Sequence, residues 1–116
     1  FLNTPESLLP IFQKVNNLLF HLDVGHAQVA GRENNLTKRF LMKLKGKLVH
    51  VHFSDNKGNN DDHLPVGAGR IDWKDIIKQL KKIGYNKTIT LEIFVEDRYY
   101  LLYSREKIRE FWNRVK

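Results

Sequence analysis

The chain has 116 residues and 41% hydrophobic side chains, which suits one modest domain with a core and excludes a disordered composition. It contains no cysteine, so disulfides and thiolate metal sites are excluded and His, Asp and Glu remain as the metal ligands. The net charge of +7 does not by itself indicate nucleic acid, because most of the lysines fall on the polar faces of predicted helices.

The chain begins with a predicted helix and a predicted strand. Thr4 is placed to cap a helix over residues 4–15, and Pro5 fits its first position, where a missing N–H costs nothing. The apolar stripe of this helix consists of Leu8, Leu9, Phe12 and Val15. Alternating apolar and polar side chains then predict a strand over residues 18–23, with residues 24–27 as its exit.

A second helix and a second strand follow. A polar turn between Gly31 and Asn35 leads into a helix over about residues 37–44, which ends at Gly46. Its inward side chains are predicted to be Phe40, Leu41 and Leu44. The strand over residues 48–53 alternates three large apolar residues with two histidines, so two imidazoles share one face.

The rest of the chain predicts a helix, a strand and a last helix. Asp72 is placed to cap the third helix, which ends at Gly84. Its buried stripe is predicted to be Ile76, Ile77, Leu80 and Ile83. A strand over residues 88–93 follows, then a helical turn at 99–103 and a helix capped by Ser104. This alternation of four helices with three strands predicts an α/β fold with a parallel sheet and helical crossovers.

The three predicted strands each end in a polar side chain. These side chains are Asp23, His52 and Glu92. Because neighbouring parallel strands lie about 4.8 Å apart and end at one edge of the sheet, the three groups can converge on one ion. Imidazole and carboxylate without thiolate suit zinc, manganese or a similar divalent ion. The sequence therefore predicts a metal site at this edge.

Further polar residues surround this edge. His26 follows the first strand, while Asp61 and His63 lie in the loop after the second, so all three are available as additional ligands. We interpret Asp62 as a loop hydrogen-bonding residue. We interpret His21 and His50, which lie one layer deeper, as groups that orient the ligands or fill the interior.

Four segments carry a resemblance to a known family: LDVGHA, HVHFSDN, DDHLPVGAGRIDW and TLEIF. They resemble the C-terminal half of the xylose isomerase-like TIM barrels, which include sugar isomerases and epimerases and endonuclease IV (AP endonuclease family 2). The resemblance runs from about Leu8 to Trp112. It implies a partial TIM barrel in which the three parallel strands correspond to strands 6 to 8. Residues 1–116 would then form a single fragment, the C-terminal half of a (β/α)8 barrel.

The resemblance implies a metal-dependent isomerase or epimerase that acts on a small sugar or sugar phosphate. Asp23, His52 and Glu92 correspond to ligands of a divalent ion, with Mn²⁺ or Zn²⁺ expected. Glu92 also corresponds to the catalytic residue that moves a proton, and His26 corresponds to a residue that contacts substrate.

Two alternatives remain open. In endonuclease IV, an Asp-x-x-His motif and an Asp-x-His motif supply ligands for three metal ions that act on abasic DNA. Asp23 with His26, and Asp61 with His63, fit these motifs, whereas Ala68 departs from the common Gly-Glu-Gly of the loop. The third interpretation is an inert half-barrel whose edge residues only satisfy loop hydrogen bonds.

The predicted sheet is incomplete for a barrel. Three strands cannot close a barrel that needs eight, and free strand edges promote association. The first residue is Phe1 and a helix start follows at once, so we expect a fragment or a processed chain. We therefore expect either the missing N-terminal half or self-association to cover the edges, and no activity from the fragment alone. Without a long apolar run or a signal-peptide pattern, we expect a cytoplasmic location and no membrane partner.

Overall fold

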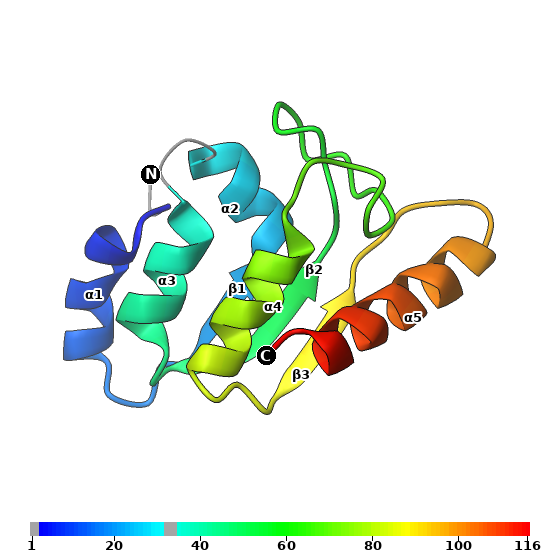
Figure 1. Cartoon of the computed structure of the whole chain (residues 1–116). Coiled ribbons are helices and arrows are strands. Elements are labelled where there is room, and N and C mark those ends of the chain that lie inside the picture. The colour runs from blue at the N-terminus through cyan, green and yellow to red at the C-terminus, as the bar shows by residue number, and fades with distance from the viewer. Residues whose placement is uncertain (1–2, 32–34) are drawn as a thin grey trace.

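A computed structural model of the chain describes residues 3–31 and 35–116 (Figure 1). Its centre is a parallel sheet with the strand order β1-β2-β3. The strands are β1 (Phe20–Asp23), β2 (Leu48–Phe53) and β3 (Thr88–Leu91). The helices in the described ranges are α1 (Pro5–Lys14), α2 (Val24–Gly31), α3 (Leu36–Leu44), α4 (Trp73–Lys82) and α5 (Tyr99–Arg114). The predicted α/β class with three parallel strands is confirmed.

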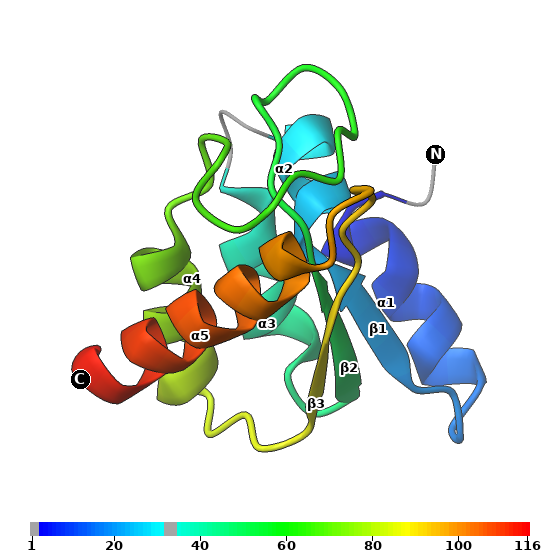
Figure 2. The same ribbon diagram turned by 90° about the vertical axis from the view of Figure 1, so that its right-hand side faces the viewer.

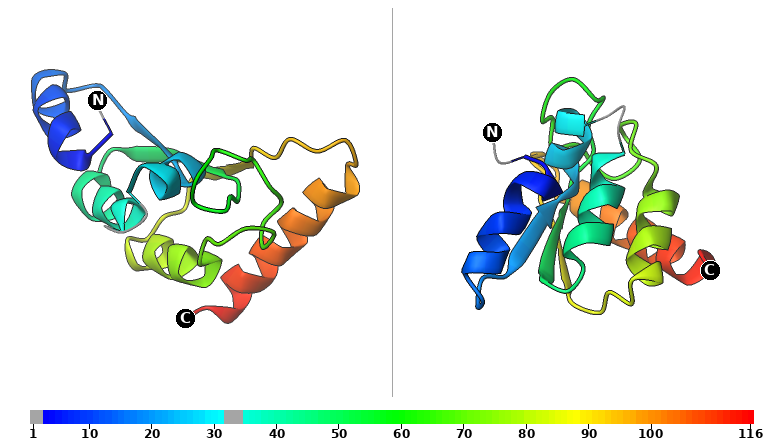
Figure 3. Two further views of the ribbon diagram at one scale, coloured as in Figure 1. Left: turned by 90° about the horizontal axis from the view of Figure 1, so that it is seen from above. Right: turned by 90° about the vertical axis from the view of Figure 1, so that its left-hand side faces the viewer.

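The helices form a layer on one side of the sheet. Seen from above, α1, α3, α4 and α5 lie along an arc outside the strands, and the described chain places no helix on the opposite side (Figure 3). The turned view shows β1, β2 and β3 side by side with the loop after β2 above them (Figure 2). The arrangement is that of a segment of a barrel wall, with helices outside and strands inside.

The two faces of the sheet differ in chemistry. Val51 and Phe53 on β2 are fully buried toward the helices, and Phe53 lies 4.7 Å from the Trp73 ring between centroids. The alternate residues His50 and His52 are only partly buried on the other face. Burial of each large apolar side chain contributes about 1.5–3 kcal/mol, so the apolar face holds the helices to the sheet.

Two predicted helix starts are confirmed by their hydrogen bonds. The Thr4 side chain accepts from the Ser7 backbone N–H at 3.2 Å, and the Ser7 hydroxyl completes a capping box at the start of α1. The Asp72 carboxylate accepts from the Asp75 N–H at 3.1 Å at the start of α4. After α4, Gly84 adopts a φ of 69°, a left-handed conformation that favours glycine.

The prediction of four helices is wrong, because residues 24–31 form α2 rather than a strand exit. Buried residues in α2 include Val24, Gly25 and Ala27, which do not form the spaced apolar stripe by which a helix is recognised. Its first turn is held instead by the Asp23 carboxylate, which accepts from the His26 N–H, and by the Asn56 side chain, which donates to the Gly25 carbonyl. The predicted turn after Gly31 falls partly on residues outside the described ranges.

Other predicted boundaries also differ. Strand β1 begins at Phe20 instead of residue 18, and Val15 is 42% exposed instead of facing the core. Strand β3 ends at Leu91, so Glu92 follows the strand directly. The predicted turn at 99–103 and the helix after it are one helix, α5. Ser104 lies buried within α5 and is not a cap, because its hydroxyl accepts from the Val66 N–H at 3.1 Å.

The helices in residues 3–31 and 35–116 are all too short or too polar to cross a membrane.

Candidate metal centre

The strand register places the predicted ligands at one edge of the sheet. Asp23 pairs with His52 across β1 and β2, and the deeper pair is His21 with His50. Glu92 follows β3, and its N–H donates to the Phe53 carbonyl at 2.9 Å, which continues the strand pairing past the end of β3. Asp23, His52 and Glu92 each offer a ligand atom, and these atoms lie within 4.8 Å of one another. The structure therefore brings the three predicted residues together.

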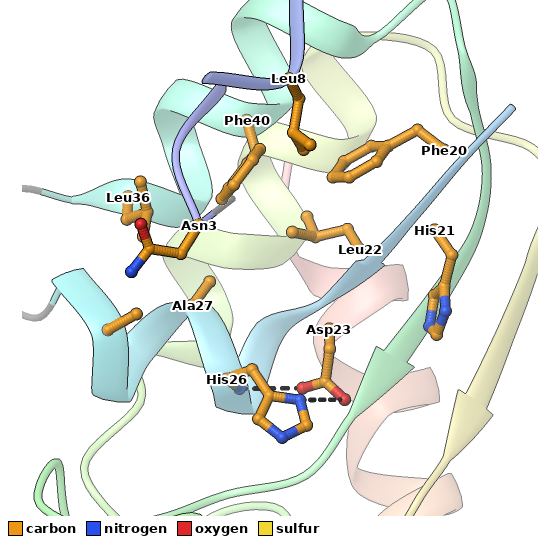
Figure 4. Close-up of a pocket in the computed structure, with 11 residues that line it drawn as sticks. Asn3, Leu8, Phe20, His21, Leu22, Asp23, His26, Ala27, Leu36 and Phe40 are labelled. Carbon is orange, nitrogen blue, oxygen red and sulfur yellow. Dashed lines mark hydrogen bonds and ion pairs between the residues drawn. The ribbon is translucent and has the colours of Figure 1, made fainter. Parts of the chain in front are cut away.

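Asp23 is fixed by the helix that follows it. One carboxylate oxygen accepts from the His26 backbone N–H at 2.9 Å, and the other lies 2.9 Å from His26 Nδ1 (Figure 4). The first contact is an N-cap, which satisfies a free N–H of α2 and places the negative charge at the positive end of the helix. The Asp23 side chain is only 15% exposed. The interaction that caps α2 therefore also orients Asp23 as a candidate ligand.

His52 lies between the two carboxylates. Its Nδ1 is 3.2 Å from Glu92 Oε2 and 3.9 Å from Asp23 Oδ2. A ring nitrogen and two carboxylate oxygens at this spacing form a donor set that suits a divalent ion of intermediate softness.

A second cluster lies beside the first, in the loop after β2. Asp61 Oδ2 is 2.7 Å from His26 Nε2 and 2.8 Å from His63 Nε2. His63 Nδ1 lies 2.9 Å from the Glu92 carbonyl oxygen, which links this cluster back to β3. The ligand atoms of His26, Asp61 and His63 also lie within 4.8 Å of one another.

The two clusters form one closed ring in which carboxylates and imidazoles alternate. We call it the rim ring, and its members are Asp23, His26, Asp61, His63, Glu92 and His52. Burial lowers the pKa of His63, but the Glu92 carbonyl, the Asp61 carboxylate and the Glu92 charge outweigh it and raise the pKa above its ordinary value. The carboxylates and the carbonyl around His63 thus favour its cationic form.

One carboxylate oxygen of the rim ring fits a metal ligand particularly well. Asp61 Oδ1 is buried and has no hydrogen-bond partner among the described residues. Buried carboxylate oxygens are normally satisfied, and an unsatisfied one calls for a donor or a cation. The residues present therefore fit a bound divalent ion.

Below the rim ring lies a layer of histidines. His50 Nδ1 is 2.6 Å from the Thr88 hydroxyl and His50 Nε2 is 3.1 Å from the Thr90 hydroxyl, so both its nitrogens are engaged by β3. The His21 and His52 rings lie 4.0 Å apart between centroids. Partial burial and the neighbouring His52 and His50 lower the pKa of His21. His21, His50 and His52 form a third group of potential ligand atoms. Because both nitrogens of His50 are engaged by β3, His50 is better placed to support the site than to bind an ion.

The comparison with known proteins agrees with this geometry. A sequence model described as the xylose isomerase-like TIM barrel matches residues 1–112. The chain belongs to that family. An uncharacterized protein of Methanocaldococcus jannaschii is 38% identical over 91 residues, which cover 77% of this chain and 31% of that protein. A second uncharacterized protein of the same organism is 37% identical over 82 residues, or 71% of this chain and 31% of that protein. The chain thus spans about a third of the length of these family relatives.

Solved structures are similar to this family member over most of its length. A D-tagatose 3-epimerase-like protein superposes with a TM-score of 0.82 at 33% identity, covering 97% of this chain and 42% of that one. The apo form of 3-keto-D-glucoside 4-epimerase from E. coli gives a TM-score of 0.64 at 21% identity, covering 90% and 40%, and supports the fold alone. The partial TIM barrel predicted from the sequence is confirmed.

Several residues at the site had no role in the sequence analysis. The Phe94 ring stacks on His63 with 4.2 Å between centroids, and the threonines of β3 hold His50. Thr88 and Thr90 alternate along the polar face of β3, and this pattern could have predicted their contact with His50 on the neighbouring strand. Asp62, interpreted as a loop hydrogen-bonding residue, accepts from the Lys57 N–H at 3.1 Å.

Gly25 allows the first turn of α2 to approach the end of β2 closely. A Cβ atom at Gly25 would lie 2.6 Å from the Ser54 hydroxyl and 3.3 Å from the Ser54 carbonyl oxygen. The Asn56 side chain also donates to the Gly25 carbonyl at 3.0 Å. The position of Asp23 and His26 therefore depends on the absence of a side chain at Gly25.

We predict that Gly25→Ala lowers the free energy of unfolding by about 1–3 kcal/mol, the usual cost of an added group in a packed site. Gly46→Ala is the control, because a Cβ there would meet no atom within 4 Å among the described residues. Urea denaturation of both variants measures the difference, and equal stability of the two would contradict the close approach of α2 and β2.

Proposed function

We propose that the chain is part of a metal-dependent isomerase or epimerase that acts on a small sugar or sugar phosphate. The observation that carries this proposal is the convergence of Asp23, His52 and Glu92 at the ends of three adjacent strands. Membership of the xylose isomerase-like family and the likeness to a D-tagatose 3-epimerase-like protein support a sugar substrate.

We assign the roles as follows. Asp23, His52 and Glu92 would hold a divalent ion, with Mn²⁺ or Zn²⁺ expected, and the bound ion would polarise substrate oxygens. Glu92, whose side chain is 31% exposed, is the residue we assign to proton transfer at the carbon next to a carbonyl. His26, whose side chain is 61% exposed at the rim, is the residue we assign to substrate contact, and its Nε2 would exchange the Asp61 carboxylate for a substrate oxygen.

The activity would belong to a complete barrel. The described strands β1 and β3 are the outer strands of the sheet, and a pocket of about 220 Å³ lies beside β1 (Figure 4). Its walls include Leu8, Phe20 and Phe40. We propose that residues 1–116 are one fragment of a (β/α)8 barrel, and that further barrel strands or a second copy cover these edges. The cytoplasmic location stays a prediction.

The first test of this function is metal binding. We expect Mn²⁺ or Zn²⁺ to bind the chain in calorimetric titration, and Glu92→Gln to weaken binding by at least about tenfold because it removes a charged ligand. Glu96→Gln, which changes an exposed residue four positions along the chain, is the matched control. In a complete barrel, Glu92→Gln should also abolish exchange of the substrate proton with solvent in D-tagatose. Full activity of the Glu92→Gln barrel would contradict both enzymatic proposals for this site. It would leave the interpretation in which these edge residues only satisfy loop hydrogen bonds.

A second candidate function is a phosphodiesterase related to endonuclease IV. The second cluster of His26, Asp61 and His63, with the unsatisfied Asp61 Oδ1, favours it because that enzyme class uses several metal ions. Duplex DNA with a single abasic site separates the two functions. For the complete barrel we expect one equivalent of metal and no nicking, whereas three equivalents with nicking would replace the epimerase proposal.

The free sheet edges generate a test of association. We expect sedimentation velocity of the isolated chain to show self-association that depends on concentration, because unpaired parallel strands present free N–H and C=O groups. A stable, monodisperse monomer over the whole concentration range would contradict the proposal that the edges need a partner.

A further inference from the structure

Asp55 carries a carboxylate that is completely buried at the exit of β2. Its relative exposure is 0%, and it lies three residues after His52. Oδ1 accepts from the N–H groups of Asn56 at 2.9 Å and Ile71 at 3.2 Å. Oδ2 accepts from the Gly67 N–H and the Trp73 indole N–H, both at 2.8 Å. Four donors on one buried carboxylate form a strong, charge-assisted network.

These donors come from both ends of the loop after β2. Asn56 opens the loop, Gly67 and Ile71 close it, and Trp73 is the first residue of α4. At Gly69 the loop passes so close that a Cβ would lie 2.3 Å from Asp55 Oδ1. The loop over residues 56–72 is therefore folded around this carboxylate.

The same loop carries two members of the rim ring. Asp55 and Leu64 exchange backbone hydrogen bonds at 2.9 and 2.8 Å, and Leu64 directly follows His63. The His63 carbonyl in turn accepts from the Phe94 N–H at 3.1 Å. The Asp55 carboxylate hydrogen-bonds to the two ends of the loop rather than to the rim ring, while the Asp55 backbone pairs with Leu64 directly beside His63.

We propose that Asp55 is a positioning residue that sets Asp61 and His63 against His26 and Glu92. The ligands Asp23 and His52 depend instead on the pairing of β1 with β2. Loss of the Asp55 network should therefore disturb one half of the rim ring and spare the other. The proposal rests on the proposed function only in taking the rim ring as the functional site.

The test measures the histidine rings directly. Long-range ¹H–¹⁵N spectra of the imidazoles are recorded for the chain and for Asp55→Asn, in which an amide group would face at least one backbone or indole N–H donor. We expect the His63 and His26 resonances to shift and those of His52 to stay. This readout needs no metal, so it is independent of whether the proposed function holds.

Two further variants make the outcome decisive. Asp72→Ala removes the cap of α4 at the end of the same loop without touching the Asp55 carboxylate, so it reports a merely structural effect. Trp73→Phe removes one donor and keeps an aromatic ring against Phe53, so it tests the network if Asp55→Asn does not fold. We expect Trp73→Phe to shift His63 and His26 less than Asp55→Asn does, and Asp72→Ala to shift neither.

The outcomes that overturn the proposal are read from the same spectra. Unchanged His63 and His26 resonances in a folded Asp55→Asn or Trp73→Phe chain would overturn the proposal. Equal shifts of His52 and His63, or equal shifts in Asp72→Ala, would also overturn it.

Discussion

The pairing of β1 with β2 is the constraint on which the site depends. It places Asp23 opposite His52 at the edge of the sheet, and His21 opposite His50 one layer deeper. A shift of one residue would turn each of these side chains to the opposite face, because side chains alternate along a strand. The apolar residues Val51 and Phe53 prevent that shift, since it would expose them to water. Hydrophobic burial on one face thus fixes the polar geometry on the other.

The interactions at the polar edge both satisfy the backbone and position the candidate ligands. The Asp23 carboxylate caps α2 and contacts the ring of His26, and His63 bridges Asp61 to the backbone of Glu92. Each contact lowers the cost of bringing charged groups together at a partly buried edge. The closed ring of carboxylates and imidazoles is consequently held in place by the fold itself, as a metal or catalytic site would require.

The loop after β2 illustrates how a long irregular segment is made rigid. Its backbone would leave many polar groups unsatisfied, and the buried Asp55 carboxylate supplies acceptors for several of them. The loop is therefore ordered by a local polar core in place of the apolar core that orders the helices. That difference explains why functional side chains can be carried on a loop without losing their geometry.

The sequence by itself determined the strands, the helices with clear stripes and caps, and the candidate ligands at the strand ends, because these follow from local periodicity and residue chemistry. It did not determine α2, whose residues lack an apolar stripe, or the continuity of α5, where Ser104 reads locally as a cap but bonds to Val66. It placed His26, Asp61 and His63 at one edge without determining that Asp61 contacts both histidines, and it did not determine that Asp55 is buried. Only the tertiary structure decided these features, since each depends on groups distant in sequence whose approach is fixed by packing.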